Sequence, residues 1–353
     1  MGSIWDDCCG QCYRSSETLS TWSKAYKLVN SLRGSRGLIV GWAFQPAKAK
    51  QTPLVSGTYR MLMVLQRLGL LCLLWGLFLW AVPSQAGRAY PPEAALFDHT
   101  HADWAKLLLR AVHTDQGGSV SKLDYQVFLD DKHAFDNYLK ALSAVSVEQF
   151  KGFSRSEQLA FLLNAYNSFM VAKIMTRYPG IASVWDFGRV LNTPFKHRFF
   201  DLLGKRRSLD DIEHRLIRGD SVLMDPRIHF AVNCASVGCP ALRGEPFLAP
   251  RLGTQLEDQT IRFLNDRNRN YYDGESGRLF VSPLFDWYGG DFKPPKNQSP
   301  RNVIGFLLHY AAALGLSGDQ QKRLAEGKET IDYSNYDWRL NAVTDAQALS
   351  ESE

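Results

Sequence analysis

The chain has 353 residues, of which 45% are hydrophobic and 12% aromatic, so it is long enough for one large core or two modest cores. This composition excludes a disordered or fibrous protein. Nine of the 41 basic residues but only three of the 36 acidic ones lie in residues 1–86. The remainder carries 32 basic against 33 acidic residues, so the net charge of +5 gives no reason to expect a nucleic-acid partner.

An uncharged apolar run of fifteen residues occupies positions 68–82, with Arg60 and Arg67 before it and Pro83 directly after it. A membrane-spanning helix needs about 20 apolar residues, so this run is short for a span. Basic residues, a short apolar run and a small residue such as Ala86 are typical of a cleavable signal peptide. We therefore predict a signal peptide at 61–86 and a periplasmic or secreted domain at 87–353, which meets the membrane only through that signal.

Residues 1–60 precede this signal and show no clear periodic pattern. Met61 and Met63 lie where the start of an exported protein belongs, so our hypothesis is that 1–60 are a wrongly extended reading frame. The alternative is a signal anchor that follows a cytoplasmic tail. A lipoprotein signal fits less well, because Cys72 lies inside the apolar run and does not end it.

The strongest helical pattern in the predicted domain covers 154–177. Ser154 stands three residues before Glu157, which is the spacing of a capping box. Apolar residues occupy nearly every face, so we expect this helix to be buried on most sides. Asn164 and Asn167 must then be hydrogen-bonded, either in a polar network of the core or in one wall of a ligand site. Before it we expect helices over 91–113, 135–142 and 147–150, and a short strand over 120–125.

The second half of the domain mixes short strands with helices. We expect a strand that leads into a turn over 199–205, strands over 227–232 and 279–287, the last broken by Pro283, and helices over 208–219, 252–264 and 303–314. An aromatic tail at 333–341 is expected to dock on the body. A regular alternation of strand and helix is missing, which favours a single α+β globular domain, mainly helical with a small sheet.

The densest group of chemically versatile residues lies at 227–243. Cys234 and Cys239 could supply a thiolate nucleophile, and His229 or His214 could act as its base. On one continuous strand, His229 and Cys234 would face opposite ways, because their separation is an odd number. The other interpretations are a structural disulfide between the two cysteines, a metal site and ordinary packing. The spacing lacks the tight pairs of a metal site, so we predict no metal.

Five segments in this order resemble the family called domain of unknown function 547: SEQLAFLLNAYNS, SLDDIEHRLIR, DPRIHFAVNCASVGCPAL, SPLFDWYGGDF and YDWRLN. The resemblance covers about 119–341 and is densest at 154–265. It implies an exported bacterial member and a fold distantly similar to papain-like or transglutaminase-like cysteine enzymes, with Cys234 or Cys239 as nucleophile. Those enzymes place the cysteine before its histidine, whereas His214 and His229 come first here, so the analogy requires a permuted order.

Two function hypotheses follow. The first is a thiol-dependent hydrolase or transferase that acts on a peptide or amide bond, with Cys234 as nucleophile. The second is a non-catalytic ligand-binding or scaffolding module with a structural Cys234–Cys239 disulfide and a small molecule or peptide as partner. The sequence has no glycine-rich phosphate loop, so we predict no cofactor. The candidate ligand-binding residues are Asn164, Asn167, Asn233 and Arg243.

Overall fold

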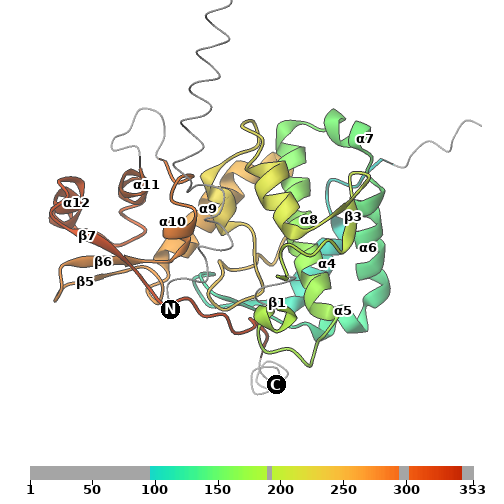
Figure 1. The fold of residues 1–353 in the computed structure, drawn as a ribbon, viewed down its shortest axis with the longest axis horizontal. Coiled ribbons are helices and arrows are strands. Elements are labelled where there is room, and N and C mark those ends of the chain that lie inside the picture. Colours follow the sequence, from blue (N-terminus) through green and yellow to red (C-terminus); the bar gives the residue numbers. More distant parts are fainter. Residues whose placement is uncertain (1–95, 189–192, 294–301, 344–353) are drawn as a thin grey trace, which may run out of the picture. The chain divides into compact units, whose positions relative to one another are not determined.

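The computed structural model describes residues 96–188, 193–293 and 302–343. The predicted signal peptide, the upstream extension and the first residues of the predicted domain lie outside these ranges. No helix among the described residues is long and apolar enough to cross a membrane. The described part is a mainly helical α+β unit, as predicted, with most of its helices at one end and a small sheet at the other (Figure 1).

The helical end is built around α8 (Arg155–Met175), whose side chains are buried almost continuously from Leu159 to Ile174. The predicted capping box is confirmed, because Ser154 and Glu157 each accept a hydrogen bond from the backbone N–H of the other. A long apolar helix of this kind gains its stability from what packs around it. Within the described residues, the helices that precede it are α4 (Ala102–Ala111), α5 (Gln126–Asp130), α6 (Lys132–Ala144) and α7 (Val147–Gly152).

Among the described residues, short strands form three separate sheets. The antiparallel hairpins are β1 (Val112–Thr114) with β2 (Ser121–Leu123), and β3 (Phe200–Leu202) with β4 (Lys205–Arg207). In the three-stranded sheet, β6 (Arg278–Val281) pairs antiparallel with β5 (Tyr271–Asp273) and parallel with β7 (Thr330–Tyr333). Two helices, α11 (Val303–His309) and α12 (Gly318–Ala325), lie with that sheet at the left end of Figure 1.

The buried apolar side chains form two clusters. The larger cluster surrounds α8 and takes in α4, α5 and α6. The smaller cluster is rich in phenylalanine and joins α9 (Leu252–Asn265) to α10 (Leu284–Trp287) and α11. Phe230 belongs to the smaller cluster, whereas its neighbours Ile228 and Ala231 belong to the larger one. The segment around His229 therefore runs between the two clusters.

The prediction of a strand over 227–232 is wrong, because Pro226–Phe230 form the 3-10 helix η4. Asp225 caps this helix by accepting a hydrogen bond from the N–H of Arg227 at 2.9 Å. Pro226 occupies the first helical position, where no N–H is needed. The apolar residues of RIHFAV suggested a strand, but Asp225 and Pro226, which are helix-start signals, determine the local structure.

Three further elements differ from prediction. The helix expected over 303–314 ends at His309, and α12 follows, begun by a capping box between Ser317 and Gln320 that the sequence contains. Pro283 begins α10, so the strand ends at Val281. The helix expected over 208–219 forms a π-helix, η3 (Asp211–Ile217), a rare geometry that is frequent at functional sites.

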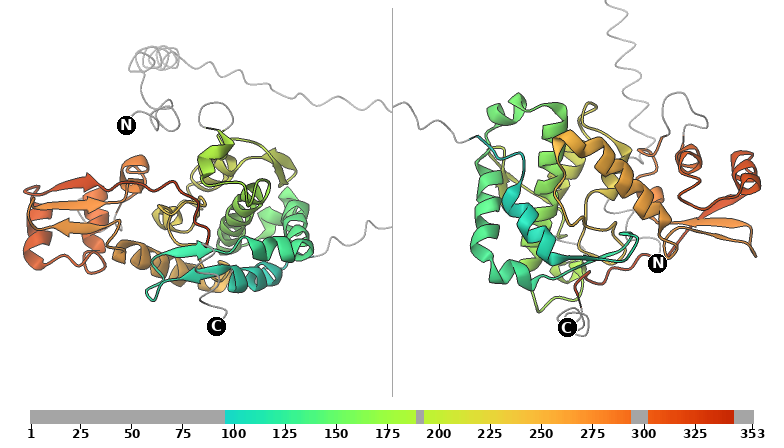
Figure 2. Two further views of the ribbon diagram at one scale, coloured as in Figure 1. Left: turned by 90° about the horizontal axis from the view of Figure 1, so that it is seen from below. Right: turned by 180° about the vertical axis from the view of Figure 1, so that it is seen from behind.

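The segment that follows β7 runs from the sheet back across the helical end (Figure 2). The N–H of Gly238 donates to the carbonyl of Asp337 at 2.8 Å, and the N–H of Leu340 donates to the carbonyl of Ala182 at 2.8 Å. The N–H of Val343 donates to the carbonyl of Leu123 at 3.1 Å. The prediction that this tail docks on the body is therefore confirmed.

Candidate functional site

The two candidate nucleophiles are joined in a disulfide, with Sγ of Cys234 and Sγ of Cys239 1.98 Å apart and the Cα atoms 6.0 Å apart. The disulfide closes the loop between η4 and the segment before α9. Tyr336, from the C-terminal tail, places its hydroxyl 3.3 Å from each sulfur. Burial raises the pKa of Tyr336 to about 12, so this hydroxyl keeps its proton at neutral pH. In this form neither sulfur is a free thiol.

His229 is fully buried and lies against the ring of Tyr288, with the ring centroids 4.0 Å apart. Its Nε2 lies 2.9 Å from Oδ2 of Asp291, and the same oxygen accepts a hydrogen bond from Nε of Arg218 at 2.6 Å. Burial acts to raise the pKa of Asp291, but the hydrogen bonds from His229 and Arg218 outweigh it and lower the pKa to about 2. Asp291 is therefore a carboxylate that fixes the orientation of the imidazole.

His214 belongs to the same polar cluster but lies nearer its exposed side. Arg218 donates from Nη1 to Nδ1 of His214 at 2.5 Å, which leaves Nε2 of His214 to carry the proton. That nitrogen lies 3.5 Å from Oδ1 of Asp210. Burial raises the pKa of Asp210, and the nearby His214 opposes this shift. Among the described residues, neither His214 nor His229 forms a hydrogen bond with a cysteine sulfur.

Glu213, on the π-helix, is one of the residues that sequence reasoning missed. Its side chain is 8% exposed, and Oε1 has no hydrogen-bond partner among the described residues. That oxygen lies 3.9 Å from Nδ1 of His229, which is also buried and also lacks a partner there. Burial raises the pKa of the Tyr166 hydroxyl, and the nearby Glu213 carboxylate raises it further. Two buried polar atoms thus face each other across a distance too long for a direct hydrogen bond.

Sequence signals for these missed residues exist but are weak. Glu213 directly precedes His214, and Asp210 stands one helical turn earlier. Asp291 lies in SPLFDWYGGDF, one of the five family motifs, but nothing in that segment singles out its carboxylate. A separation of 62 residues between His229 and Asp291 carries no periodic signal. Only the fold brings these groups together.

Two of the three candidate asparagines, Asn164 and Asn167, hold backbone segments against α8, and the third, Asn233, donates from its side chain to the carbonyl of Pro240 at 2.8 Å. Asn164 donates to the carbonyl of Phe247 at 2.8 Å and accepts from its N–H at 3.0 Å. Asn167 donates to the carbonyl of Ala231 at 3.0 Å and accepts from the N–H of Asn233 at 2.9 Å. This is the polar network that the sequence predicted as one of two alternatives. Ligand binding by these amides stays a prediction, and a ligand would have to compete with those contacts.

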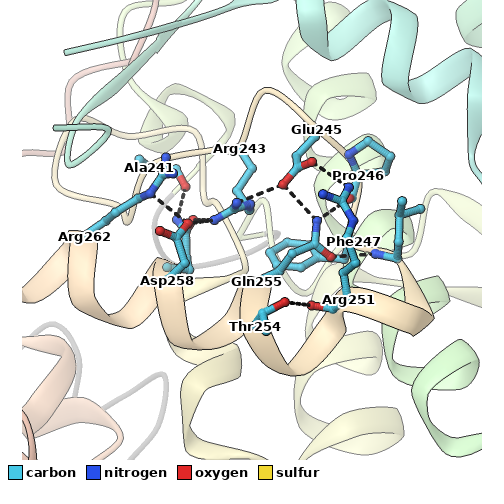
Figure 3. A network of polar contacts seen from close by, with 12 residues as sticks. Ala241, Arg243, Glu245, Pro246, Phe247, Arg251, Thr254, Gln255, Asp258 and Arg262 are labelled. Atoms are coloured by element: carbon cyan, nitrogen blue, oxygen red, sulfur yellow. Dashed lines mark hydrogen bonds and ion pairs between the residues drawn. The ribbon is translucent and has the colours of Figure 1, made fainter. Parts of the chain in front are cut away.

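Arg243 lies in a separate polar network next to α9 (Figure 3). Its Nη1 donates to Asp258 at 2.5 Å, and its Nη2 donates to Glu245 at 2.9 Å. Glu245 also accepts hydrogen bonds from Arg251 and Gln255. Burial acts to raise the pKa of Glu245, but hydrogen bonds, chiefly from Arg243, lower it to about 2. Both terminal nitrogens of Arg243 are thus engaged within the protein, so this side chain fixes the segment before α9.

A group of partly exposed aromatic side chains continues from the disulfide loop. The ring of Tyr336 lies 4.4 Å from that of Trp338 and 4.9 Å from that of Trp287, measured between centroids. The ring of Trp185 lies 5.0 Å from that of Trp338. These rings come from three distant segments, and the docked tail joins them beside the disulfide.

A comparison with family models found a match that covers the core of this site. Residues 150–264 match the model described as Protein of unknown function, DUF547. The DUF547 segment holds the π-helix, His229 and both cysteines, whereas Asp291 and Tyr336 come from later residues. The match supports the resemblance expected from the five sequence motifs.

Searches of curated proteins and of solved structures each found no match. The expected similarity to papain-like or transglutaminase-like enzymes therefore stays a prediction. Within the described ranges, no group of three or more histidine, cysteine, aspartate or glutamate side chains could hold a metal ion.

Proposed function

We propose that the domain binds a small ligand that carries a hydrogen-bond donor, an amine or a hydroxyl, between Glu213 and His229. The observation that supports it is a pair of buried atoms 3.9 Å apart, Oε1 of Glu213 and Nδ1 of His229, neither of which has a hydrogen-bond partner among the described residues. An unpaired buried polar group costs about 1–3 kcal/mol. Native proteins rarely keep such groups without a functional or solvent partner.

The character of the ligand follows from what the two atoms can do. In the neutral ring of His229, with the Nε2 proton directed at Asp291, Nδ1 presents a lone pair. The Glu213 carboxylate only accepts hydrogen bonds. An ammonium or hydroxyl group could donate to both atoms, whereas a carboxylate or phosphate would meet the charges of Glu213 and Asp291.

The disulfide favours this binding hypothesis over a thiol-dependent hydrolase or transferase. A thiol mechanism needs a free thiolate, and both candidate sulfurs are bonded to each other. The chain, purified without reductant, should be alkylated in its native state and digested with trypsin. Residues 228–243 form one tryptic peptide with both cysteines and no others. We expect this peptide to be unlabelled and lighter by two hydrogen atoms than its reduced form. Rapid labelling of Cys234 would instead support the hypothesis of a thiol-dependent enzyme.

We also propose that the domain acts outside the bacterial cytoplasm. The support is the apolar run at 68–82, followed by a small-residue site at Ala86. An oxidising compartment also suits a disulfide in the loop. N-terminal sequencing of the protein from its native source should find a mature chain that begins at residue 87.

The binding proposal is tested by histidine ¹⁵N NMR on the purified chain. Methylammonium chloride is the donor probe, with sodium acetate and potassium chloride at equal ionic strength as controls. We expect methylammonium alone to shift the Nδ1 signal of His229, which is assigned by its loss in His229→Gln. In Glu213→Gln the shift should be much smaller. If acetate causes the same shift, or if methylammonium causes none, the proposal is wrong.

A further inference from the structure

The disulfide loop carries a second, independent feature, which is an asymmetry between its two sulfurs. Cys234 is partly exposed, whereas Cys239 is 4% exposed. A thiolate attacks a disulfide only at a sulfur that it can reach. The accessible end of this disulfide is therefore Cys234.

The donors around the sulfurs differ as well. The backbone N–H of Cys234 donates to Sγ of Cys239 at 2.8 Å, and the hydroxyls of Tyr336 and Ser236 donate to the same sulfur at 3.3 and 3.6 Å. Sγ of Cys234 contacts the same two hydroxyls, so the backbone N–H is the donor that distinguishes Cys239. Hydrogen-bond donors stabilise a thiolate, and the better stabilised thiolate is the better leaving group.

Arg269 holds the backbone of this loop in place. Its Nη2 donates to the carbonyls of Val237 at 2.5 Å and Cys239 at 3.1 Å. The N–H of Gly238 is bound by the carbonyl of Asp337 in the docked tail. The donors around Cys239 are therefore fixed by contacts other than the disulfide and would stay in place after it opens.

We propose that Cys234–Cys239 is a thiol–disulfide exchange site, in which an incoming thiol attacks Cys234 and Cys239 leaves as the stabilised thiolate. The incoming thiolate forms a bond to Sγ of Cys234, the bond between the two cysteine sulfurs breaks, and its electron pair moves to Sγ of Cys239. A second thiolate then attacks the sulfur of the bound thiol. This releases the oxidised partner as a disulfide and leaves Cys234 as a thiolate, so that two thiols are oxidised and one disulfide is reduced.

The test uses the purified chain and reduced glutathione. The reaction is quenched in acid, the free thiols are blocked with N-ethylmaleimide, and the tryptic peptide 228–243 is sequenced by mass spectrometry. We expect glutathione on Cys234 and N-ethylmaleimide on Cys239. Glutathione on Cys239, an even distribution, or opening only in denaturant would each overturn the proposal.

Tyr336→Phe tests the contribution of the hydroxyl. We expect opening about fivefold slower, the equivalent of one hydrogen bond of about 1 kcal/mol. Tyr271→Phe is the matched control, because Tyr271 is exposed on β5, and we expect no change in rate. Equal rates for both variants, at melting temperatures equal to wild type, would contradict the assigned role of Tyr336. These outcomes do not involve Glu213 or His229, so they are independent of the binding proposal.

Discussion

His229 Nε2 lies 2.9 Å from Asp291 Oδ2, and this contact joins the 3-10 helix η4 to a segment 62 residues later in the chain. It fixes which imidazole nitrogen carries the proton and turns the other toward Glu213. The ring is held further by stacking on Tyr288. A neutral imidazole held in this way presents Nδ1 as an oriented hydrogen-bond acceptor, which is what the proposed binding of an amine or a hydroxyl requires.

Asp291→Asn should destabilise the protein in a pH-dependent way. The folded pKa of about 2 lies below the ordinary value of 3.8, so the ionised form stabilises the fold. This contribution, up to about 2 kcal/mol, is fully present above pH 4 and is lost as the pH falls toward 2. Urea unfolding at pH 6 and pH 2.5 should show a large difference between wild type and variant at pH 6 and a small one at pH 2.5.

The control for Asp291 is Asp201→Asn. The side chain of Asp201 is 64% exposed and pairs with that of Arg206, which is 56% exposed. Surface ion pairs of this kind contribute about 0–1 kcal/mol, so we expect little change at either pH. A difference for Asp291→Asn that is the same at both pH values would show that its carboxylate charge does not stabilise the fold.

Glu213→Gln should leave the free energy of unfolding unchanged or raise it by up to about 1 kcal/mol. The substitution removes a buried charge without removing a partner of Oε1, and the new amide can donate toward Nδ1 of His229. Asp211→Asn, on the same π-helix, is the matched control, because Asp211 is equally buried but pairs with Arg198 and Arg215. It should lose about 1–3 kcal/mol. Equal losses in both variants would mark Glu213 as a structural residue and remove the support for the binding site.

Asn164→Ala should lower the free energy of unfolding by about 2–4 kcal/mol. The variant leaves both the N–H and the carbonyl of Phe247 without their partner inside the core. Arg155→Ala, at the exposed start of the same helix, is the control and should change stability by no more than about 0.5 kcal/mol. Thermal unfolding followed by circular dichroism measures both variants. A small effect of Asn164→Ala would show that the loop before α9 keeps its structure without the hydrogen bonds from Asn164.

Two glycine substitutions should act in opposite directions. A Cβ at Gly238 would lie 2.9 Å from ring atoms of Tyr336 and 3.0 Å from the backbone nitrogen of Asp337, so Gly238→Ala should lose about 1–3 kcal/mol and loosen the tail. A Cβ at Gly253, in the first turn of α9, meets nothing within 4 Å. Gly253→Ala should therefore gain up to about 1 kcal/mol. Tryptic cleavage after Arg339 should speed up only in Gly238→Ala; cleavage at the wild-type rate would mean that the tail accommodates the methyl group.

The parts of the fold that the sequence predicted correctly are those with local signals. The start of α8 follows from the spacing of Ser154 and Glu157, and its burial follows from its apolar faces. Residues 227–232 were assigned wrongly because apolar β-branched residues outweighed the start signal of Asp225 and Pro226. In both segments, residues within about one helical turn of the helix start determine the local structure.

The candidate site could be predicted only in part, because its geometry is non-local. The cysteine loop and His229 stand out in the sequence, and a disulfide was one of the alternatives. Glu213 becomes significant only when its oxygen is seen to lack a partner, and Asp291 only when the chain returns to His229. Tyr336, which reaches both sulfurs, is about a hundred residues away from them, with separations of 102 and 97.

The docked tail has a consequence for how the protein is made. The hydroxyl of Tyr125 donates to Asn341 across 216 residues of chain, and the same tail brings Tyr336 to the sulfurs. During synthesis from the N-terminus, the helical end would emerge first. Its loops would make their contacts with the tail only after this last segment has been made. Contacts between such distant residues form slowly, because a long stretch of chain must be ordered to make them. Until the tail docks, the two cysteines of the loop would thus be accessible to other thiols. In that period either cysteine could form a disulfide with a wrong partner.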